Sequence, residues 1–350
     1  MPGPGGHPGH LPGDPPSGAP APAVGGGPTV AATDGLHHDD LPIDLPLVRA
    51  LVDRDHPGLA ALPLRRLRSP GSTNALYRLG DDLVVRLPRQ PGGSVAIDTE
   101  AAWLPVVGPD LPVAVPEVVA VGRPGFGYPE RWSLVRWLHG STPPVPEADG
   151  GPGPPRTELA GDLAGLAGDL AGLVRALGRV AVPPGARADP ALRGYRGGPL
   201  ATRDATMREA MAACRAIDGL SLDLDGMERV WGEAMALPDA HRAPPPRWYH
   251  GDLTSENLLV RAGRLTAVLD FGELGIGDPT IDLTVAWEVL DPPARQVFHR
   301  ALGVDGPTWL RARAWALTVA VVTLPYYWRT LPDRCARKVA VATAVLADDR

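Results

Sequence analysis

Residues 250–272 constrain this chain more than any other part of its sequence. They read HGDLTSENLLV, then the polar turn RAGR, then LTAVLDFG. Two apolar runs on either side of a short polar turn are typical of a β-hairpin. A hairpin brings its two outer ends side by side. Asn257, at the start of the first strand, and Asp270, at the end of the second, are therefore expected to converge on one point.

The residue types at this point predict phosphate chemistry. Asn257 and Asp270 offer an amide oxygen and a carboxylate oxygen, which are ligands that Mg²⁺ prefers. Phosphoryl transfer needs metal ions that bridge the phosphate oxygens and a carboxylate that orients the attacking hydroxyl. Asp252, on the loop before the hairpin, is predicted to be that catalytic carboxylate. An ordinary Asp is a weak base, so it would mainly orient the hydroxyl. His250 is expected to brace the loop.

The pattern HGDLxxxN followed by LDFG resembles the catalytic and metal loops of the aminoglycoside-phosphotransferase family. That family is related to choline kinases and, more distantly, to protein kinases. Gly251 stands where protein kinases have an Arg that senses activation-loop phosphorylation, so the resemblance implies a small-molecule kinase. Residues 277–283 (GDPTIDL) resemble the GDPxxDL element of the same family. Asp278 is expected to cap the following helix, and Asp282 to buttress the catalytic loop.

The resemblance implies an α+β, bilobal, protein-kinase-like fold, with ATP or GTP as co-substrate and Mg²⁺. Residues 1–36, rich in Pro and Gly, are expected to be a disordered tail. Residues 37–136 are expected to form a small β-rich nucleotide-binding lobe, and residues 137–350 a mostly helical lobe with the catalytic loop and the acceptor site. The pattern predicts a helix over 44–62 and strands over 64–68, 75–79, 83–87, 118–121 and 132–135. It predicts helices over 96–107, 157–180, 202–217, 226–236, 280–290 and 293–302, and two more at the C-terminus.

The resemblance also implies a phosphate-binding lysine on the third strand, paired with a glutamate on the next helix. Lys338 is the only lysine of the chain and lies near the C-terminus, so it cannot fill this position. Arg86 in the run LVVRL is predicted to take the place of the lysine, with Glu100 as its acid. Arg can hold phosphate oxygens in a bidentate way but is not a neutral replacement for Lys. The alternative for Arg86 is a solvent-facing strand residue.

Two further segments are candidates for nucleotide binding. Ser72, Thr73 and Asn74 lie in a turn that fits the cover over the nucleotide phosphates. The turn lacks the GxGxxG of protein kinases, and an ordinary hairpin turn fits it equally well. The run WSLVRWLHG at residues 132–140 resembles the hinge of the family, in which backbone groups of Arg136 and Leu138 would bind the purine edge. Trp137 in this run fits a plain core aromatic as well.

Composition excludes several other classes of protein. The formal net charge is −6, so no strongly basic surface indicates nucleic acid. The two cysteines, Cys214 and Cys335, are unclustered, which argues against a disulfide framework and structural zinc. The longest apolar run, near residues 314–324, is too short to cross a membrane, and the N-terminus has no secretion signal. A cytoplasmic protein is therefore expected. The sequence leaves the oligomeric state open.

The phosphate acceptor is expected to be a hydroxylated small molecule bound between the catalytic loop and the C-terminal helices. Candidate contacts are Arg196 with residues 197–200, Asp204, Glu273, Tyr326 and Tyr327. A polycationic aminoglycoside would need several carboxylates, for which Asp218, Asp223, Asp225 and Glu288 are candidates, although solvated surface acids are the commoner case. Three functions stay open: a kinase that inactivates an aminoglycoside or another antibiotic, a kinase of a metabolite such as choline, an amino alcohol or a sugar, and a nucleotide-binding pseudokinase. The missing lysine motivates the third.

Overall fold

The computed structural model describes residues 39–67, 73–144, 156–242 and 245–348. The predicted tail, residues 1–36, and Ser72 lie outside this part of the chain. The described residues fall into two compact units. The first contains the chain up to Ile97 together with Val119–Val135, and the second contains Asp98–Val118 and the chain from Arg136 onward. The assignment of residues 37–136 to nucleotide binding and of 137–350 to catalysis and the acceptor stays a prediction.

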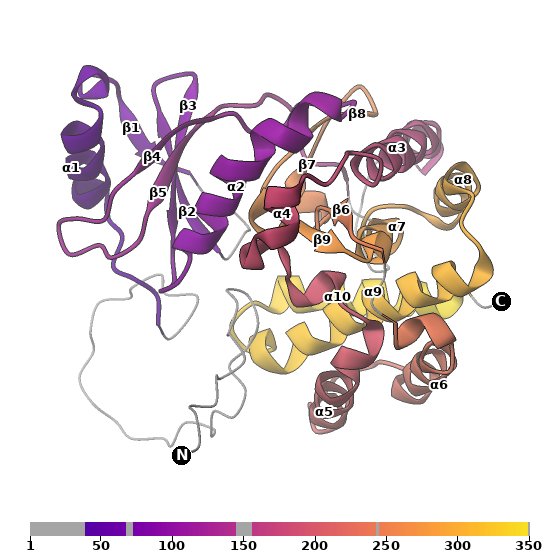
Figure 1. The fold of residues 1–350 in the computed structure, drawn as a ribbon. Helices are drawn as coiled ribbons and strands as arrows, with labels where there is room; N and C mark the ends of the chain where they lie inside the picture. The colour runs from indigo at the N-terminus through magenta and orange to yellow at the C-terminus, as the bar shows by residue number, and fades with distance from the viewer. Residues whose placement is uncertain (1–38, 68–72, 145–155, 243–244, 349–350) are drawn as a thin grey trace, which may run out of the picture. The chain divides into compact units, whose positions relative to one another are not determined.

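The first unit is built on a five-stranded sheet with the strand order β1-β2-β3-β5-β4 (Figure 1). Its strands are β1 (Leu64–Arg66), β2 (Asn74–Leu79), β3 (Leu83–Pro88), β4 (Val118–Gly122) and β5 (Trp132–Arg136). The five strands predicted from the sequence are all present, each within two residues of its expected ends. The pairs β1–β2 and β2–β3 are antiparallel. Val48, Leu51 and Val52 of helix α1 (Leu45–Asp55) share the apolar core with the sheet.

Helix α1 is shorter than the predicted helix over residues 44–62. It begins at the cap residue Asp44, whose side chain accepts the Leu47 amide at 2.8 Å, and it ends at Asp55. His56 precedes Pro57, and a residue before proline is forced away from the helical conformation. A 3₁₀ turn at Pro57–Leu59 follows instead.

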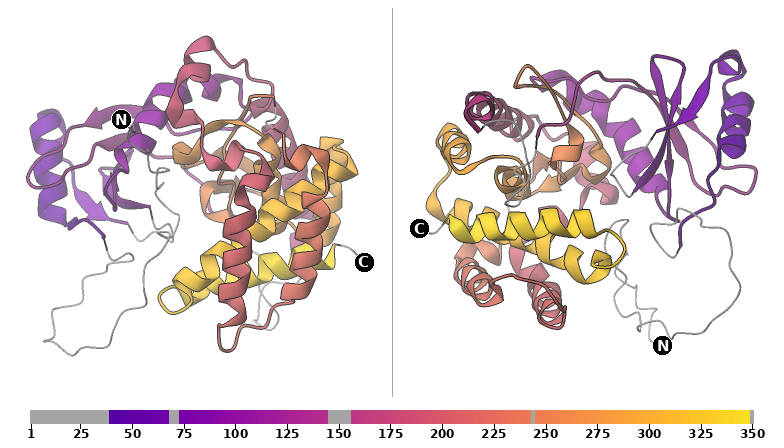
Figure 2. Two further views of the ribbon diagram at one scale, coloured as in Figure 1. Left: turned by 60° about the horizontal axis from the view of Figure 1, so that its bottom comes forward. Right: turned by 180° about the vertical axis from the view of Figure 1, so that it is seen from behind.

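The second unit is mostly helical. Helix α2 (Ser94–Val107) begins in the first unit and continues into the second, and it is followed by α3 (Arg156–Leu177), α4 (Pro184–Ala188), α5 (Asp204–Arg215), α6 (Leu224–Met235), α7 (Val285–Glu288), α8 (Pro292–Leu302), α9 (Gly306–Tyr327) and α10 (Pro332–Ala347). Helices α9 and α10 pack on each other, α3 packs on α8, and α5 and α6 pack on α9 (Figure 2). The predicted leucine stripe of α3 is buried: Leu163, Leu166, Leu170, Leu173 and Leu177 all lie in the core. None of the helices in the described part of the chain is long and apolar enough to cross a bilayer.

Two short antiparallel sheets carry the segment of interest within this unit. Strand β6 (Arg247–Tyr249) pairs with β9 (Gly275–Gly277), and β7 (Leu258–Arg261) pairs with β8 (Arg264–Val268). The helix predicted over residues 280–290 is divided into a 3₁₀ turn, Pro279–Thr284, and the short helix α7. Asp291 has an extended backbone and caps α8 by accepting the Ala294 amide. Only the residues between Thr284 and Asp291 are therefore left to form α7. Cys214 and Cys335 are buried free thiols, as the sequence predicts.

Candidate active site

Asp282 holds the backbone of the loop that follows β6. Its two carboxylate oxygens accept the His250 amide at 2.8 Å and the Gly251 amide at 2.7 Å. Burial, with 1% of the residue exposed, raises the pKa of Asp282 to about 7, although the two amide bonds oppose this shift. Asp278 caps the intervening turn by accepting the Thr280 amide. Both structural roles predicted for these aspartates are confirmed.

His250 braces the same loop from the inside. Its Nε2 lies 3.0 Å from the Leu269 carbonyl, and its Nδ1 accepts the Asp252 amide at 3.1 Å. A carbonyl can only accept, so the proton must be on Nε2 and the imidazole is neutral. Burial lowers the pKa of His250, which agrees with this tautomer. Its ring also packs against Phe271, with the centroids 4.5 Å apart. The predicted bracing role is confirmed.

The predicted hairpin is present as β7 and β8. Its register pairs Leu258 with Val268, so the outer ends of the two strands lie side by side. The Leu269 amide donates to the Asn257 carbonyl at 2.7 Å and extends the pairing by one residue beyond the strands. Asp270 comes directly after this bond. The hairpin therefore brings Asn257 and Asp270 together, as the spacing predicts.

The side chain of Asn257 has a defined orientation. Its Nδ2 donates to the Asp252 carbonyl at 2.9 Å and to the Asp252 carboxylate Oδ2 at 3.1 Å. Both partners are acceptors, so the amide nitrogen must face Asp252, and the amide oxygen points away as the atom available to a cation. Asp270 has a φ of 56°. A left-handed conformation of this kind is uncommon outside glycine and tends to occur at functional sites.

Two oxygen donors at this point fit Mg²⁺, which usually takes one or two protein ligands and completes its shell with phosphate oxygens and water. Within the residues that the structure describes, no three His, Cys, Asp or Glu side chains form a group that could hold a metal by themselves. Asn257 and Asp270 would be the protein ligands of a Mg²⁺ ion at this point, and its other positions would be left to phosphate oxygens and water.

Arg196 contacts the predicted catalytic carboxylate from a distant part of the chain. Its Nη1 donates to Asp252 Oδ1 at 2.9 Å and also to the Gly251 carbonyl, and its Nε lies 3.6 Å from Glu273 Oε2. Burial disfavours the charged form of Asp252. The charge of Arg196 and its hydrogen bond outweigh burial and lower the pKa of Asp252. The sequence pattern predicted Arg196 as a contact of the acceptor and did not predict its pairing with Asp252. The available signal was that Arg196 precedes two glycines.

Helix α10 adds two ion pairs near the loop. Arg337 Nη2 lies 2.8 Å from Oε1 of Glu256, which belongs to the catalytic loop. Lys338 pairs with Glu288 at the end of α7, and both side chains are largely buried. The charge of Lys338 also lowers the pKa of Asp252. The single lysine of the chain therefore lies in the second unit, which also contains the catalytic loop, and not on the sheet of the first.

The predicted nucleotide residues of the sheet and of α2 are buried. Arg86 on β3 is 7% exposed, so it is not a solvent-facing strand residue. Glu100 on α2 is 1% exposed and belongs to the second compact unit, whereas Arg86 belongs to the first. The Thr73 carbonyl accepts the Arg89 amide at 2.9 Å. Asn74 is the first residue of β2 rather than a loop residue.

The hinge segment follows β5. The Arg136 amide donates to the Glu117 carbonyl at 3.0 Å, so this amide already has a partner within the chain. Leu138 is half-buried and lies outside regular structure. Trp137 is half-buried and its indole donates to His139 Nδ1 at 3.3 Å, so it is not a plain core aromatic.

Several acidic residues that were predicted to contact the phosphate acceptor are bonded to other side chains of the protein. Asp204 accepts hydrogen bonds from Arg208 and from the Trp231 indole, and Asp225 pairs with Arg215 at 2.8 Å. Tyr326 and Tyr327 pack edge to face at the end of α9, with their centroids 4.5 Å apart. These contacts are the ordinary ones of a helical surface.

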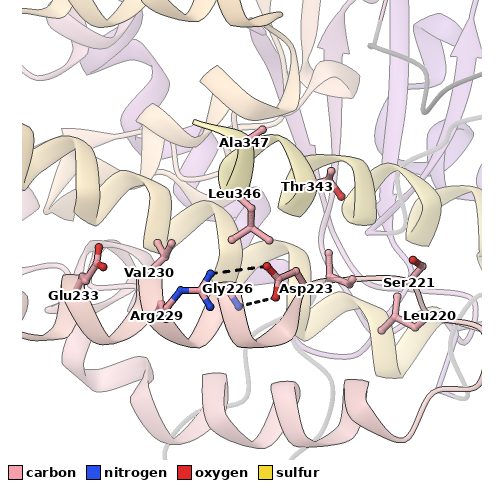
Figure 3. Close-up of a pocket in the computed structure, with 11 residues that line it drawn as sticks. Leu220, Ser221, Asp223, Gly226, Arg229, Val230, Glu233, Thr343, Leu346 and Ala347 are labelled. Carbon is pink, nitrogen blue, oxygen red and sulfur yellow. Dashed lines mark hydrogen bonds and ion pairs between the residues drawn. The ribbon is translucent and has the colours of Figure 1, made fainter. Parts of the chain in front are cut away.

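Asp223 lies at the edge of a pocket of about 790 Å³ between α6, the residues before it and the last turns of α10 (Figure 3). Its carboxylate accepts the Gly226 amide at 2.8 Å and lies 4.0 Å from Arg229. The lining residues Thr343, Leu346 and Ala347 belong to the C-terminal end of α10. None of the lining residues belongs to the segment around Asp252.

A five-stranded sheet followed by a mostly helical unit, with a loop–hairpin segment that carries Asp252, Asn257 and Asp270, is the arrangement of the kinase-like fold. The chain belongs to the phosphotransferase enzyme family, whose model matches residues 65–315.

Curated relatives match shorter stretches. An aminoglycoside 3'-phosphotransferase of Escherichia coli is 28% identical over 113 residues, which is 30% of this chain and 42% of that protein. A second one from Escherichia coli is 41% identical over 68 residues, 18% of this chain and 23% of that protein. The chain thus spans less than half the length of the curated relatives it matches.

Solved structures match almost the whole described chain. The GDP and kanamycin complex of APH(2")-IIia has a TM-score of 0.64 at 20% identity and covers 87% of this chain and 99% of that one. The apoenzyme of the macrolide 2'-phosphotransferase MphH from Brachybacterium faecium has a TM-score of 0.55 at 22% identity, with 87% and 98% covered. At such low identity these likenesses establish the fold, namely a β-rich unit followed by a mostly helical one.

Proposed function

We propose that this protein is a small-molecule kinase that transfers the γ-phosphate of ATP or GTP to a hydroxyl of its acceptor. The observation that carries the proposal is the arrangement of Asp252, Asn257 and Asp270. Asn257 is tied to Asp252 by two hydrogen bonds, and its carbonyl accepts the amide of Leu269, the residue before Asp270. In this proposal Asp252 is catalytic, and Asn257 and Asp270 hold Mg²⁺, which would neutralise the phosphate charge.

Nucleotide binding is proposed for residues on three other segments. These are Arg86 and Glu100 for the phosphates, Ser72, Thr73 and Asn74 for the turn, and Arg136 and Leu138 for the purine edge. The burial of Arg86 supports its part, because a buried guanidinium is expected to serve a charged partner.

Asp252 has the properties that an orienting carboxylate needs. Its lowered pKa keeps it ionised at neutral pH, so it can accept a hydrogen bond from a hydroxyl. Oδ1 already accepts from Arg196 and Oδ2 from Asn257. Each carboxylate oxygen has a second lone pair, so an acceptor hydroxyl can bind without displacing either partner. A base this weak receives the proton late, after the phosphoryl group has begun to move.

The charges around the loop favour an acceptor with few positive charges. Three nearby acids each have a basic partner within the chain: Glu256 with Arg337, Glu273 with Arg196, and Glu288 with Lys338. An amino sugar with several ammonium groups would need carboxylates without such partners. A macrolide or a hydroxylated metabolite therefore fits better than an aminoglycoside, even though aminoglycoside and macrolide phosphotransferases are both among the similar proteins.

A pseudokinase is the weaker alternative. It is motivated by the absence of the phosphate-binding lysine, but Arg86 offers a buried cation on the corresponding strand. The hydrogen bonds that orient Asp252 and Asn257 would have no evident purpose in a protein that only binds nucleotide.

The test is a transfer assay with Mg²⁺ and γ-labelled ATP or GTP. Its acceptors are kanamycin, a macrolide and choline, with water as the background acceptor. We expect Asp252→Asn to lower turnover by roughly 10²–10⁴-fold, the usual loss for a missing general base, while the protein stays folded. Asp270→Ala is expected to lose turnover as well. Near wild-type turnover in either variant would contradict the proposed roles. Nucleotide binding without transfer to any acceptor or to water would favour the pseudokinase.

A further inference from the structure

The catalytic loop contains no cation of its own. Residues 250–257 read HGDLTSEN, with neither Lys nor Arg among them. The cation that contacts Asp252 is Arg196, which stands 56 residues earlier in the chain, in the short turn Tyr195–Gly197. One guanidinium nitrogen, Nη1, bonds both the carboxylate of Asp252 and the carbonyl of Gly251. The contact therefore restrains the side chain and the backbone of the loop together.

Close backbone packing holds the turn of Arg196 against the loop. A Cβ added to Gly197 would lie 2.2 Å from a ring carbon of Tyr249, and one added to Gly277 would lie 2.2 Å from the Gly197 carbonyl oxygen. That carbonyl accepts the Asp278 amide at 2.9 Å. The turn thus lies directly on the β6–β9 sheet, and β6 leads straight into the catalytic loop. The β6–β9 sheet therefore supports both the turn of Arg196 and the loop of Asp252.

Glu273 restrains the guanidinium from its other side. Arg196 Nε lies 3.6 Å from Glu273 Oε2, while Nη1 contacts Asp252. The Arg196 side chain is 15% exposed. An arginine fork between two carboxylates in a mostly buried position has little freedom to leave either of them. The packing of the site therefore holds the ion pair of Arg196 and Asp252 in place.

The other charged groups near Asp252 do not replace Arg196. His250 is neutral, as its hydrogen bonds require, and Asp282 and Asp270 carry no positive charge. Lys338 on α10 contributes charge from a distance while it is paired with Glu288. Arg196 is the cation in direct contact with the carboxylate.

We infer that Arg196 is a positioning residue that aims the Asp252 carboxylate for the transfer. This inference rests on the proposed kinase function. Without Arg196, the carboxylate would lose the bond that sets the rotation of its side chain, and the Gly251 carbonyl would lose the same donor. Turnover would then fall, because the carboxylate would no longer orient the acceptor hydroxyl.

The experiment compares three variants of the full chain: Arg196→Gln, Arg196→Lys and, as a matched control, Arg193→Gln. Arg193 is exposed, and its guanidinium bonds the Arg187 carbonyl instead of the catalytic loop. The first readout is kcat and KM for the best acceptor, or the rate of transfer to water, with Mg–ATP in excess. The second is the same measurement for Arg196→Gln combined with Asp252→Asn, because a residue that acts only through Asp252 has nothing left to position in that background.

We expect Arg196→Gln to lower kcat by roughly 10–10²-fold with little change in KM, the usual cost of a misplaced catalytic group, and to have no further effect in the Asp252→Asn background. Arg196→Lys should lower kcat less, because Lys preserves the charge and loses the planar fork. Arg193→Gln should change neither kcat nor KM. If Arg196→Gln does not fold, Arg196→Lys still decides the matter: a wild-type turnover in that variant would contradict the inference.

The outcomes separate this inference from the proposed function. Wild-type kcat in the Arg196→Gln variant, or an equal loss with and without Asp252→Asn, would overturn the positioning role and leave the kinase intact. A wild-type protein that transfers phosphate to nothing, even to water, would overturn the kinase function.

Discussion

The sheet of the first unit is held by apolar side chains that pack on one another, whereas the catalytic segment of the second is held by hydrogen bonds between polar groups. Tyr77, Val85 and Trp132 are fully buried in the sheet core. The catalytic segment also depends on two buried polar groups, Asp282 and His250, and each has a defined partner. Apolar packing accepts many residue types at a given volume, while a buried hydrogen bond accepts few.

The two regions should therefore fail in different ways. A change of volume should damage the sheet, and a change of hydrogen-bonding capacity at nearly constant volume should damage the catalytic segment.

The largest effect is expected from Gly122→Ala on β4. A Cβ at this position would lie 1.9 Å from the indole ring of Trp132, which is fully buried and cannot move aside. Overpacking of this kind costs about 3 kcal/mol of unfolding free energy. Urea unfolding followed by tryptophan fluorescence measures the loss. Gly58→Ala is the control, because a Cβ there meets nothing within 4 Å. Equal midpoints for the two variants would show that the sheet core is loosely packed.

The next effect is expected from Asp282→Asn. An asparagine can accept only one of the two amides that Asp282 accepts, so a buried donor loses its partner at a cost of about 2 kcal/mol. Turnover should fall too, because the loop is no longer held. Asp305→Asn is the control: Asp305 caps α9 at an exposed position, where Asn caps equally well.

The same variant tests the pKa of Asp282. Its pKa is raised to about 7 in the folded protein, above the ordinary value near 4, so the folded state binds the proton more tightly. The carboxyl therefore lowers stability progressively as the pH rises from about 4 to about 7. Asparagine does not titrate, so the stability advantage of wild type over Asp282→Asn should shrink across this range. A constant difference from pH 4 to pH 7 would contradict the raised pKa.

The smallest effect is expected from Arg86 on β3. This residue tests the comparison of the two regions directly, because it is a charged residue buried in the apolar sheet. Arg86→Ala should lower kcat/KM for the nucleotide roughly tenfold, or about 1.4 kcal/mol, by removing a phosphate contact. Arg86→Lys should show no loss or a gain if phosphate binding is its role. An unaffected Arg86→Ala would rule that role out, and unfolding curves would show whether stability changed instead.

Much of the fold could be predicted because its signals are local. Each strand of the sheet has its own apolar run, and the hairpin has two runs and a turn within residues 250–272. The predicted length of α1 was wrong because the apolar pattern continues past Pro57, whereas the backbone before this proline cannot remain helical. The small β6–β9 sheet was missed because three residues are too few for a periodic pattern.

By itself, the sequence determined that Asn257 and Asp270 come together, because a hairpin register sets their separation whatever surrounds them. It also determined that Asp282 supports the loop. Only the tertiary structure decided the partners of these groups: Arg196 on Asp252 and Arg337 on Glu256, across 56 and 81 residues. The physical reason is that a guanidinium can pair with any carboxylate. Which one it reaches depends on how the helices and the glycine turn pack.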